Sequence, residues 1–188
     1  MKKSILALMI GVALSFSAIA ATSYAINPDH TFSSIGINQL GFSFQLGRFN
    51  RTSGKIRLDP ESATGSIHFT IETASISTGL AKLTAELRGK DFLDAGRYPQ
   101  ITFVADKLGF DNGRLAGADG MLTLRGVSKP LHVTVGHFDC GMSSSTRKNT
   151  CGANATATLN RSDFGMDKYV PVISDETHIA IRLEAVQD

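Results

Sequence analysis

The stretch Gly120-Met-Leu-Thr-Leu-Arg-Gly-Val-Ser-Lys-Pro-Leu-His-Val-Thr-Val135 reads as two short β-strands joined by a turn. Before the turn, Leu122 and Leu124 stand two residues apart, and after it Leu131 and Val133 do the same. Such alternation predicts strands with one buried and one solvent-exposed face. The connection between them is polar and contains Gly and Pro, as turns do. The buried face must meet either a packed core or a ligand.

The same alternation recurs along the whole chain, and turn residues separate the alternating segments. Many short strands of this kind indicate a mainly β protein, built as an antiparallel barrel or sandwich. The predicted strands cover residues 24–27, 33–38, 42–49, 54–58, 66–72, 101–107, 114–125 (with a break near Gly117), 130–139, 152–160 and 177–186.

One segment departs from this pattern. Leu80, Leu83 and Leu87 recur at the spacing of a helix face, and Thr78 is suited to cap the start of that helix. We therefore predict one or two short helices near residues 78–95. Inserted between strands, they could cover one end of a barrel.

The predicted strands share a nearly charge-free face. In the 66–72 strand, Ile67, Phe69 and Ile71 alternate with polar residues, and in the clear strands every charged residue falls on the opposite face. The 152–160 strand places alanines on the apolar face. Small residues there leave room for a cavity, although they also suit a tight core opposite large side chains.

The first twenty residues are typical of a cleaved signal peptide, with a basic start, an apolar run and the cleavage motif Ala18-Ile19-Ala20. We expect export to the periplasm and one barrel domain over residues 21–188. Without Lys2 and Lys3, the 19 basic residues fall to 17 and match the 17 acidic ones. A mature chain of zero net charge gives no indication of nucleic-acid binding.

Cys140 and Cys151 are the two cysteines of the chain. In an exported protein, two cysteines so close in sequence favour a disulfide at the base of a polar hairpin loop. Metal binding or redox catalysis is the alternative, but the chain has no Cys-x-x-Cys motif and no nearby Cys/His cluster.

Five segments resemble motifs of the YceI-like family, in the right order along nearly the whole mature chain. The 120–135 hairpin resembles L-T-(I/L)-x-G-V-T-K-P-V. Residues 87–103 resemble H-L-(R/K)-S-x-D-F-F-D-x-x-x-Y-P-x-I-x-F. Residues 29–37, 160–166 and 173–181 resemble the D-x-x-H-S opening, the R-x-D-F-G-M segment and the closing strand.

This resemblance implies a lipocalin-like antiparallel β-barrel of about eight strands that binds a long lipid tail in an apolar lumen. Implied ligands are polyprenyl chains, including ubiquinone-like molecules, and long-chain fatty amides. The resemblance implies no enzyme activity and no required cofactor. Glu86 and Gly89 depart from the family pattern, which has His and Ser at these positions.

A lipid-carrying barrel needs a long, dry lumen, and the inward positions of the predicted strands supply candidates to line it. Packing of a filled core is the alternative role for each of them. The candidate lipid-binding residues are Ile35, Ile37, Phe42, Phe44, Phe69, Ile71, Phe92, Phe103, Leu122, Leu124, Val133, Phe164, Ile179 and Ile181.

A prenyl tail is costly to expose to water, at ~0.8 kcal/mol per CH₂ group. Transfer between a bilayer and an apolar lumen involves a much smaller change in free energy, because the tail stays in apolar surroundings. We therefore expect loading through transient contact with a membrane surface or a membrane protein. A homodimer, formed by pairing of strand edges, is compatible with the sequence.

Two other classes of protein remain open from the residues alone. One is a structural or surface-interaction barrel with a filled core. The other is an enzyme acting on a lipid, for which Asp163 beside Arg161 is the best acid–base candidate, although a surface or rim ion pair explains these two residues more simply. No metal site is expected from the spacing of the five histidines, His30, His68, His132, His137 and His178.

Overall fold

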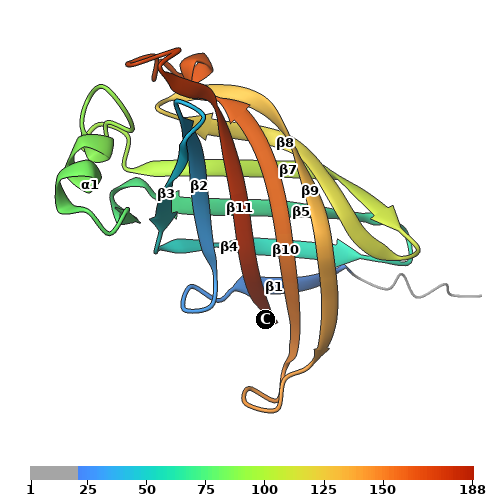
Figure 1. The fold of residues 1–188 in the computed structure, drawn as a ribbon. Helices are drawn as coiled ribbons and strands as arrows, with labels where there is room; N and C mark the ends of the chain where they lie inside the picture. Colours follow the sequence, from blue (N-terminus) through green and yellow to red (C-terminus); the bar gives the residue numbers. More distant parts are fainter. Residues whose placement is uncertain (1–20) are drawn as a thin grey trace, which may run out of the picture.

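Each segment with strong alternation forms an antiparallel strand in the computed structural model, which describes residues 21–188 (Figure 1). The predicted signal peptide falls on residues 1–20, outside the described part. The elements are β1 (Thr22–Ile26), β2 (Phe32–Gln39), β3 (Ser43–Phe49), β4 (Thr52–Asp59), β5 (Thr64–Glu72), η1 (Thr73–Ser75), β6 (Ile76–Ser77), α1 (Ala81–Arg88), β7 (Gln100–Asp111), β8 (Arg114–Leu124), β9 (Val127–Met142), β10 (Asn149–Asn160), η2 (Arg161–Phe164) and β11 (Ile173–Gln187).

The sheet closes on itself. Its strands follow the order β1-β4-β5-β7-β8-β9-β10-β11, and β11 then pairs with β1, with Ala25 opposite Val186. The predicted eight-stranded antiparallel barrel is therefore confirmed. Closure removes the two free edges that an open sheet of this size would expose.

A second, smaller ribbon leaves the barrel beside β11. The first part of β11 pairs with β2 rather than with β1, and β3 and β6 continue the sheet beyond β2. The β2–β3 hairpin therefore lies side by side with the first part of β11 and extends its wall, with Gln39 opposite Ile173 at its tip (Figure 1).

One of the strand irregularities was predicted from the sequence, and others were not. The pairing of β7 with β8 shifts register between Gly117 and Leu115, where a break was predicted. A second shift occurs between β9 and β10, at the step from Val135 to His137. A bulge of this kind inserts one residue into a strand and changes which residues face inward.

The helical segment agrees with the prediction only in part. Within residues 21–188 the one α-helix, α1, starts at Ala81 with Leu80 as its N-cap residue, and it ends at Arg88 with Gly89 as its C-cap residue. The predicted cap was wrong, because the Thr78 hydroxyl instead bonds the Thr84 hydroxyl at 3.0 Å. Residues 91–94 form turns rather than a second helix.

The predicted disulfide is present. Cys140 of β9 and Cys151 of β10 are direct partners in the sheet and are bonded to one another, with an S–S distance of 2.08 Å. Cys151 is buried, whereas Cys140 is exposed. The bridge therefore lies near the turn of the β9–β10 hairpin and closes the base of its loop.

We predict that a Cys140→Ser/Cys151→Ala double variant is less stable than the wild type. The bridge closes a loop over a sequence separation of 11 residues, and the chain-entropy model gives about 3 kcal/mol for a loop of this size. Urea unfolding followed by circular dichroism measures the difference. Reduction of the wild-type protein should reproduce it, and equal midpoints in oxidised and reduced protein would contradict the prediction.

Candidate functional site

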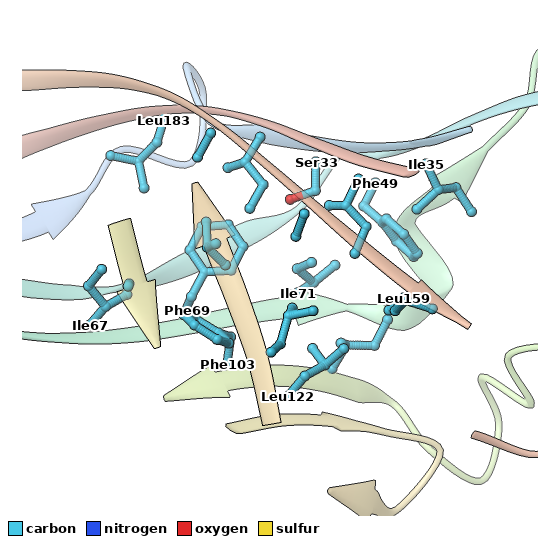
Figure 2. Close-up of a pocket in the computed structure, with 18 of the residues that line it drawn as sticks. Ser33, Ile35, Phe49, Ile67, Phe69, Ile71, Phe103, Leu122, Leu159 and Leu183 are labelled. Atoms are coloured by element: carbon cyan, nitrogen blue, oxygen red, sulfur yellow. The ribbon is translucent and has the colours of Figure 1, made fainter. Parts of the chain in front are cut away.

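The interior of the barrel holds one long apolar cavity. The centre of a water-sized sphere can occupy about 160 Å³ of it, whereas one water needs only ~10–15 Å³ by this measure. In Figure 2, Phe69 and Phe103 lie across the cavity from Leu183 and Ser33. The inward strand faces therefore enclose a space and do not meet in a filled core.

Eleven of the predicted lipid-binding residues line this cavity. They come from β2, β5, β7, β8, β9, β11 and the turn after α1, so residues far apart in sequence are brought together on one apolar wall. They are Ile35, Ile37, Phe69, Ile71, Phe92, Phe103, Leu122, Leu124, Val133, Ile179 and Ile181. Their contact with a lipid stays a prediction.

Phe42 and Phe44 do not line the cavity, so their predicted place in the lumen was wrong. Phe42 is 91% exposed at the tip of the β2–β3 hairpin, and Phe44 is 56% exposed on its outer face. The inward residues of β3 are instead Gly47 and Phe49, on the opposite parity. In this strand, apolar side chains occur on the outer face as well as on the inner face. The alternation in the sequence therefore does not reveal which face points into the barrel.

Phe164 is buried but does not line the main cavity either. It lies on η2, after β10 has ended, and is 3% exposed. Its side chain lines a separate, more open pocket with Leu131 and Leu159. The irregular turn after β10, which the alternation could not predict, directs it there.

Several lining residues were missed. Val135 and Phe138 both face the cavity although they differ in parity, because the β9 bulge lies between them. Ala155 and Ala157 provide the predicted small wall along β10. The sequence shows that these alanines lie on the inward face of the strand. Whether they border a cavity depends, however, on how far the large side chains on the opposite wall reach toward them.

Ser33 is a polar exception in this wall. Its side chain is 1% exposed, and its hydroxyl has no hydrogen-bond partner within the described protein. Figure 2 shows the oxygen directed into the cavity. A ligand oxygen or amide that reached this depth could form a hydrogen bond there.

Arg161 is the one charged side chain among the described residues that line the cavity. It is 2% exposed, and its guanidinium donates to four backbone carbonyl oxygens. These belong to Met166, Lys168, Ile173 and Ser174, at 2.5, 2.9, 3.1 and 2.9 Å. Arg161 therefore holds the 166–174 loop over one end of the barrel.

Electrostatics agree with a structural role for this arginine. Burial lowers the pKa of the Arg161 guanidinium, and the Asp175 and Asp167 carboxylates oppose that shift. The predicted rim ion pair with Asp163 was wrong, since Asp163 lies 4.0 Å from Lys129 instead. The backbone carbonyls take the place of a carboxylate partner.

The covered end of the cavity consists of two segments that meet. Leu87, Phe92 and Leu93 of the α1 segment, and Met166 of the loop after η2, line the cavity there. We call the α1 segment (residues 80–99) and the 166–174 loop together the cover. The end of the barrel is thus closed by residues outside the closed ring of strands.

Contacts between the two halves of the cover are few and exposed. The Lys168 ammonium lies 2.6 Å from the Asp91 carboxylate. The Tyr169 hydroxyl donates to Glu86 at 3.4 Å, and its ring lies 6.3 Å from that of Phe92. Glu86, one of the departures from the family pattern, therefore takes part in closing the barrel.

Tyr24 also lines the cavity, and its hydroxyl accepts a hydrogen bond from the Asn149 amide at 3.3 Å. The other titratable groups among the described residues lie outside the cavity. His30 pairs with Glu184 at 2.9 Å, and this hydrogen bond raises the pKa of His30. Within residues 21–188, no three His, Cys, Asp or Glu side chains gather in a way that could hold a metal ion. No described helix has the length and apolar character needed to cross a membrane.

A family model for the YceI-like domain matches residues 24–185. The chain belongs to the YceI-like family. A UPF0312 protein of Pseudomonas savastanoi pv. phaseolicola is 34% identical over 191 residues, covering 100% of this chain and 98% of the relative. This YceI-like chain thus matches its relative over the whole length, cover included.

Solved structures show the same fold. BcnA of Burkholderia cenocepacia superposes with a TM-score of 0.72 at 26% identity, over 85% of this chain and 98% of BcnA. A polyisoprenoid binding domain from Saccharophagus degradans, implicated in plant cell wall breakdown, gives a TM-score of 0.60 at 15% identity, over 89% of this chain and 99% of that domain. The second likeness concerns the fold alone.

We predict that Arg161→Met strongly destabilises the YceI-like barrel. The change leaves four carbonyl oxygens without their charged donor, and we expect a loss of about 3 kcal/mol in unfolding free energy. The control is Arg125→Met, which removes one bond, to the Gly165 carbonyl, and should lose less than about 1 kcal/mol. Equal losses in urea unfolding would argue against a special role for Arg161.

The ion pair across the cover should respond to pH. The hydrogen bond with Lys168 lowers the pKa of Asp91, so its stabilising effect is present above the unfolded pKa and is lost as pH falls through the folded pKa. We predict an Asp91 carboxyl midpoint below 3.8 in an NMR titration. In a Lys168→Met variant the midpoint should rise toward that value, and an unchanged midpoint would show that the pair does not form in solution.

Proposed function

We propose that this protein binds one long-tailed isoprenoid or quinone-like lipid in its barrel and carries or stores it in the periplasm. The observation that carries the proposal is the cavity itself, which is long and almost wholly apolar. A soluble protein gains nothing from an empty apolar cavity, because cavity walls lose packing contacts. An apolar ligand would restore those contacts.

The charge distribution supports binding rather than turnover of the lipid. Acid–base catalysis needs a titratable side chain near the reacting atoms, most often an imidazole or a carboxylate. Tyr24 is the titratable hydroxyl in the described lining, and it is bonded to the Asn149 amide at 3.3 Å. Among the described lining residues, none is Asp, Glu or His, and the Arg161 guanidinium is occupied by backbone carbonyls. One solved structure with the same fold is a polyisoprenoid binding domain, which also supports lipid binding.

Periplasmic carriage is favoured by the predicted signal peptide and by the disulfide, which persists in oxidising compartments. Ser33 supports a ligand that is not a pure hydrocarbon, because its hydroxyl offers one hydrogen bond within the apolar wall. A quinone, amide or hydroxyl oxygen at that depth would use it.

The direct test is to purify the protein from the periplasm of its own host, extract it with organic solvent and analyse the extract by mass spectrometry. We expect about one prenyl lipid per chain. A protein without any lipid would favour a structural barrel. Conversion of an added prenyl lipid into a product would favour an enzyme.

We predict that Ala157→Phe lowers the lipid occupancy. Ala157 lines the cavity, and a phenyl ring there would fill space that the tail needs, at a cost of ~1–3 kcal/mol, or about tenfold or more in affinity. The neighbouring Thr158→Phe is the matched control, because Thr158 points outward and is exposed. Both variants must first show wild-type circular dichroism, and equal occupancy in the two would contradict the proposed site.

A further inference from the structure

Exposed apolar side chains are concentrated at one place on the molecule. Twelve large apolar residues among the described ones are exposed, and seven of them belong to the β2–β3 hairpin or to the loop before β11. One of the seven, Tyr169, packs on Phe92 of the cover. We call the other six the apolar rim. They are Leu40, Phe42, Phe44, Leu46, Val170 and Val172.

The two parts of the apolar rim are contiguous. Gln39 pairs with Ile173, which places the hairpin turn beside the loop that carries Val170 and Val172 (Figure 1). Leu46 and Phe44 both lie over Gly36 on the outer face of the hairpin. One surface therefore runs from the hairpin to the loop.

The apolar rim is also continuous with the cavity. Val170 and Val172 lie in the same cover loop as Met166 and Tyr169. Met166 lines the cavity, and Tyr169 packs on Phe92, which lines it as well. The surface patch and the covered end of the lumen thus share one loop.

The hairpin part of the apolar rim carries little charge, which suits an apolar partner. Residues 39–47 contain no charged side chain, and the first cation after them, Arg48, is held over the Phe32 ring at 3.8 Å. Gln45 and Gln39 bond to one another at 3.0 Å, which satisfies part of their polarity. Little charge would have to lose its water if the hairpin tip entered an apolar phase.

The shape of the rim favours a fluid partner. Phe42 is 91% exposed and Leu40 57% exposed, at a turn where Leu40 and Gly41 have φ of 56° and 73°. Side chains that project from a turn insert readily into the interface of a bilayer, which conforms to them. A second copy of the chain would have to offer a complementary hollow for them.

From this continuity, charge and shape, we propose that the apolar rim docks on the surface of a lipid bilayer and places the covered end of the cavity against it. The inference deepens the proposed function, on which it rests for the reason to visit a membrane. It assigns the route by which a tail passes between bilayer and barrel without crossing water.

The test measures binding to phosphatidylcholine vesicles by flotation, with a Phe42→Ser/Leu46→Ser variant. Neither side chain lines the cavity, so the fold and the lumen stay intact. The matched control is Met121→Ser/Met142→Ser, which removes two exposed apolar side chains outside the rim. We expect at least tenfold weaker vesicle binding for the rim variant, wild-type binding for the control, and little effect of added salt.

A second measurement separates this proposal from the proposed function. A fluorescent prenyl lipid is supplied either in vesicles or by dilution from detergent. If the rim variant alone takes up lipid slowly from vesicles but loads fully from detergent, the result supports both the lipid-carrier function and the docking surface. If no chain loads by either route, yet vesicle binding still depends on the rim, then the carrier function fails and the docking surface stands.

Two results would overturn the docking surface. The first is vesicle binding that is equal in the rim variant and the wild type, or absent in both. The second is a wild-type dimer that becomes a monomer in the rim variant by light scattering, without vesicle binding, because the rim would then join two copies of the chain.

Discussion

The pairing of β11 with both β1 and β2 is the constraint on which the rest of the structure depends. Its last residues close the barrel against β1, whereas its earlier residues pair with β2. Without the first pairing the sheet would have free edges and the cavity would have no wall. Because of the second, β2 and β3 extend the wall beside β11: Ile35 and Ile37 of β2 line the cavity, whereas the tip of the hairpin projects beyond it. One strand thus produces both the lumen and the projecting hairpin.

Once the barrel is closed, side-chain volume decides between core and cavity. The β5 and β7 side of the wall carries Phe69 and Phe103, which reach far into the interior (Figure 2). The opposite wall on β10 carries Ala155 and Ala157, which do not reach back. Large residues on one side and small ones on the other leave a gap. Hydrophobicity alone would not have distinguished this arrangement from a filled core.

The sequence predicts regular strands well and irregular backbone poorly. Alternation placed Leu122, Leu124 and Val133 on the cavity wall because their strands keep one parity along the relevant length. It failed for Phe42 and Phe44, because apolar residues on the outer face of the hairpin produce the same alternation as residues that face the interior. It also could not anticipate the β9 bulge that brings Phe138 inward. A hydrophobic pattern records which residues avoid water or bind an apolar partner, but it does not record the direction in which they point.

The barrel wall and its cover are held by different kinds of contact. The wall is a continuous ladder of backbone hydrogen bonds, reinforced by the disulfide between β9 and β10. The 166–174 loop is fixed to that wall by Arg161, whose buried guanidinium bonds are strong. The two halves of the cover, however, meet through the exposed Lys168–Asp91 pair and the long Tyr169–Glu86 bond. Exposed pairs of this kind contribute little to stability, because water and salt screen the charges. The weakest contacts around the cavity therefore lie between α1 and the 166–174 loop, at the end of the barrel that carries the apolar rim.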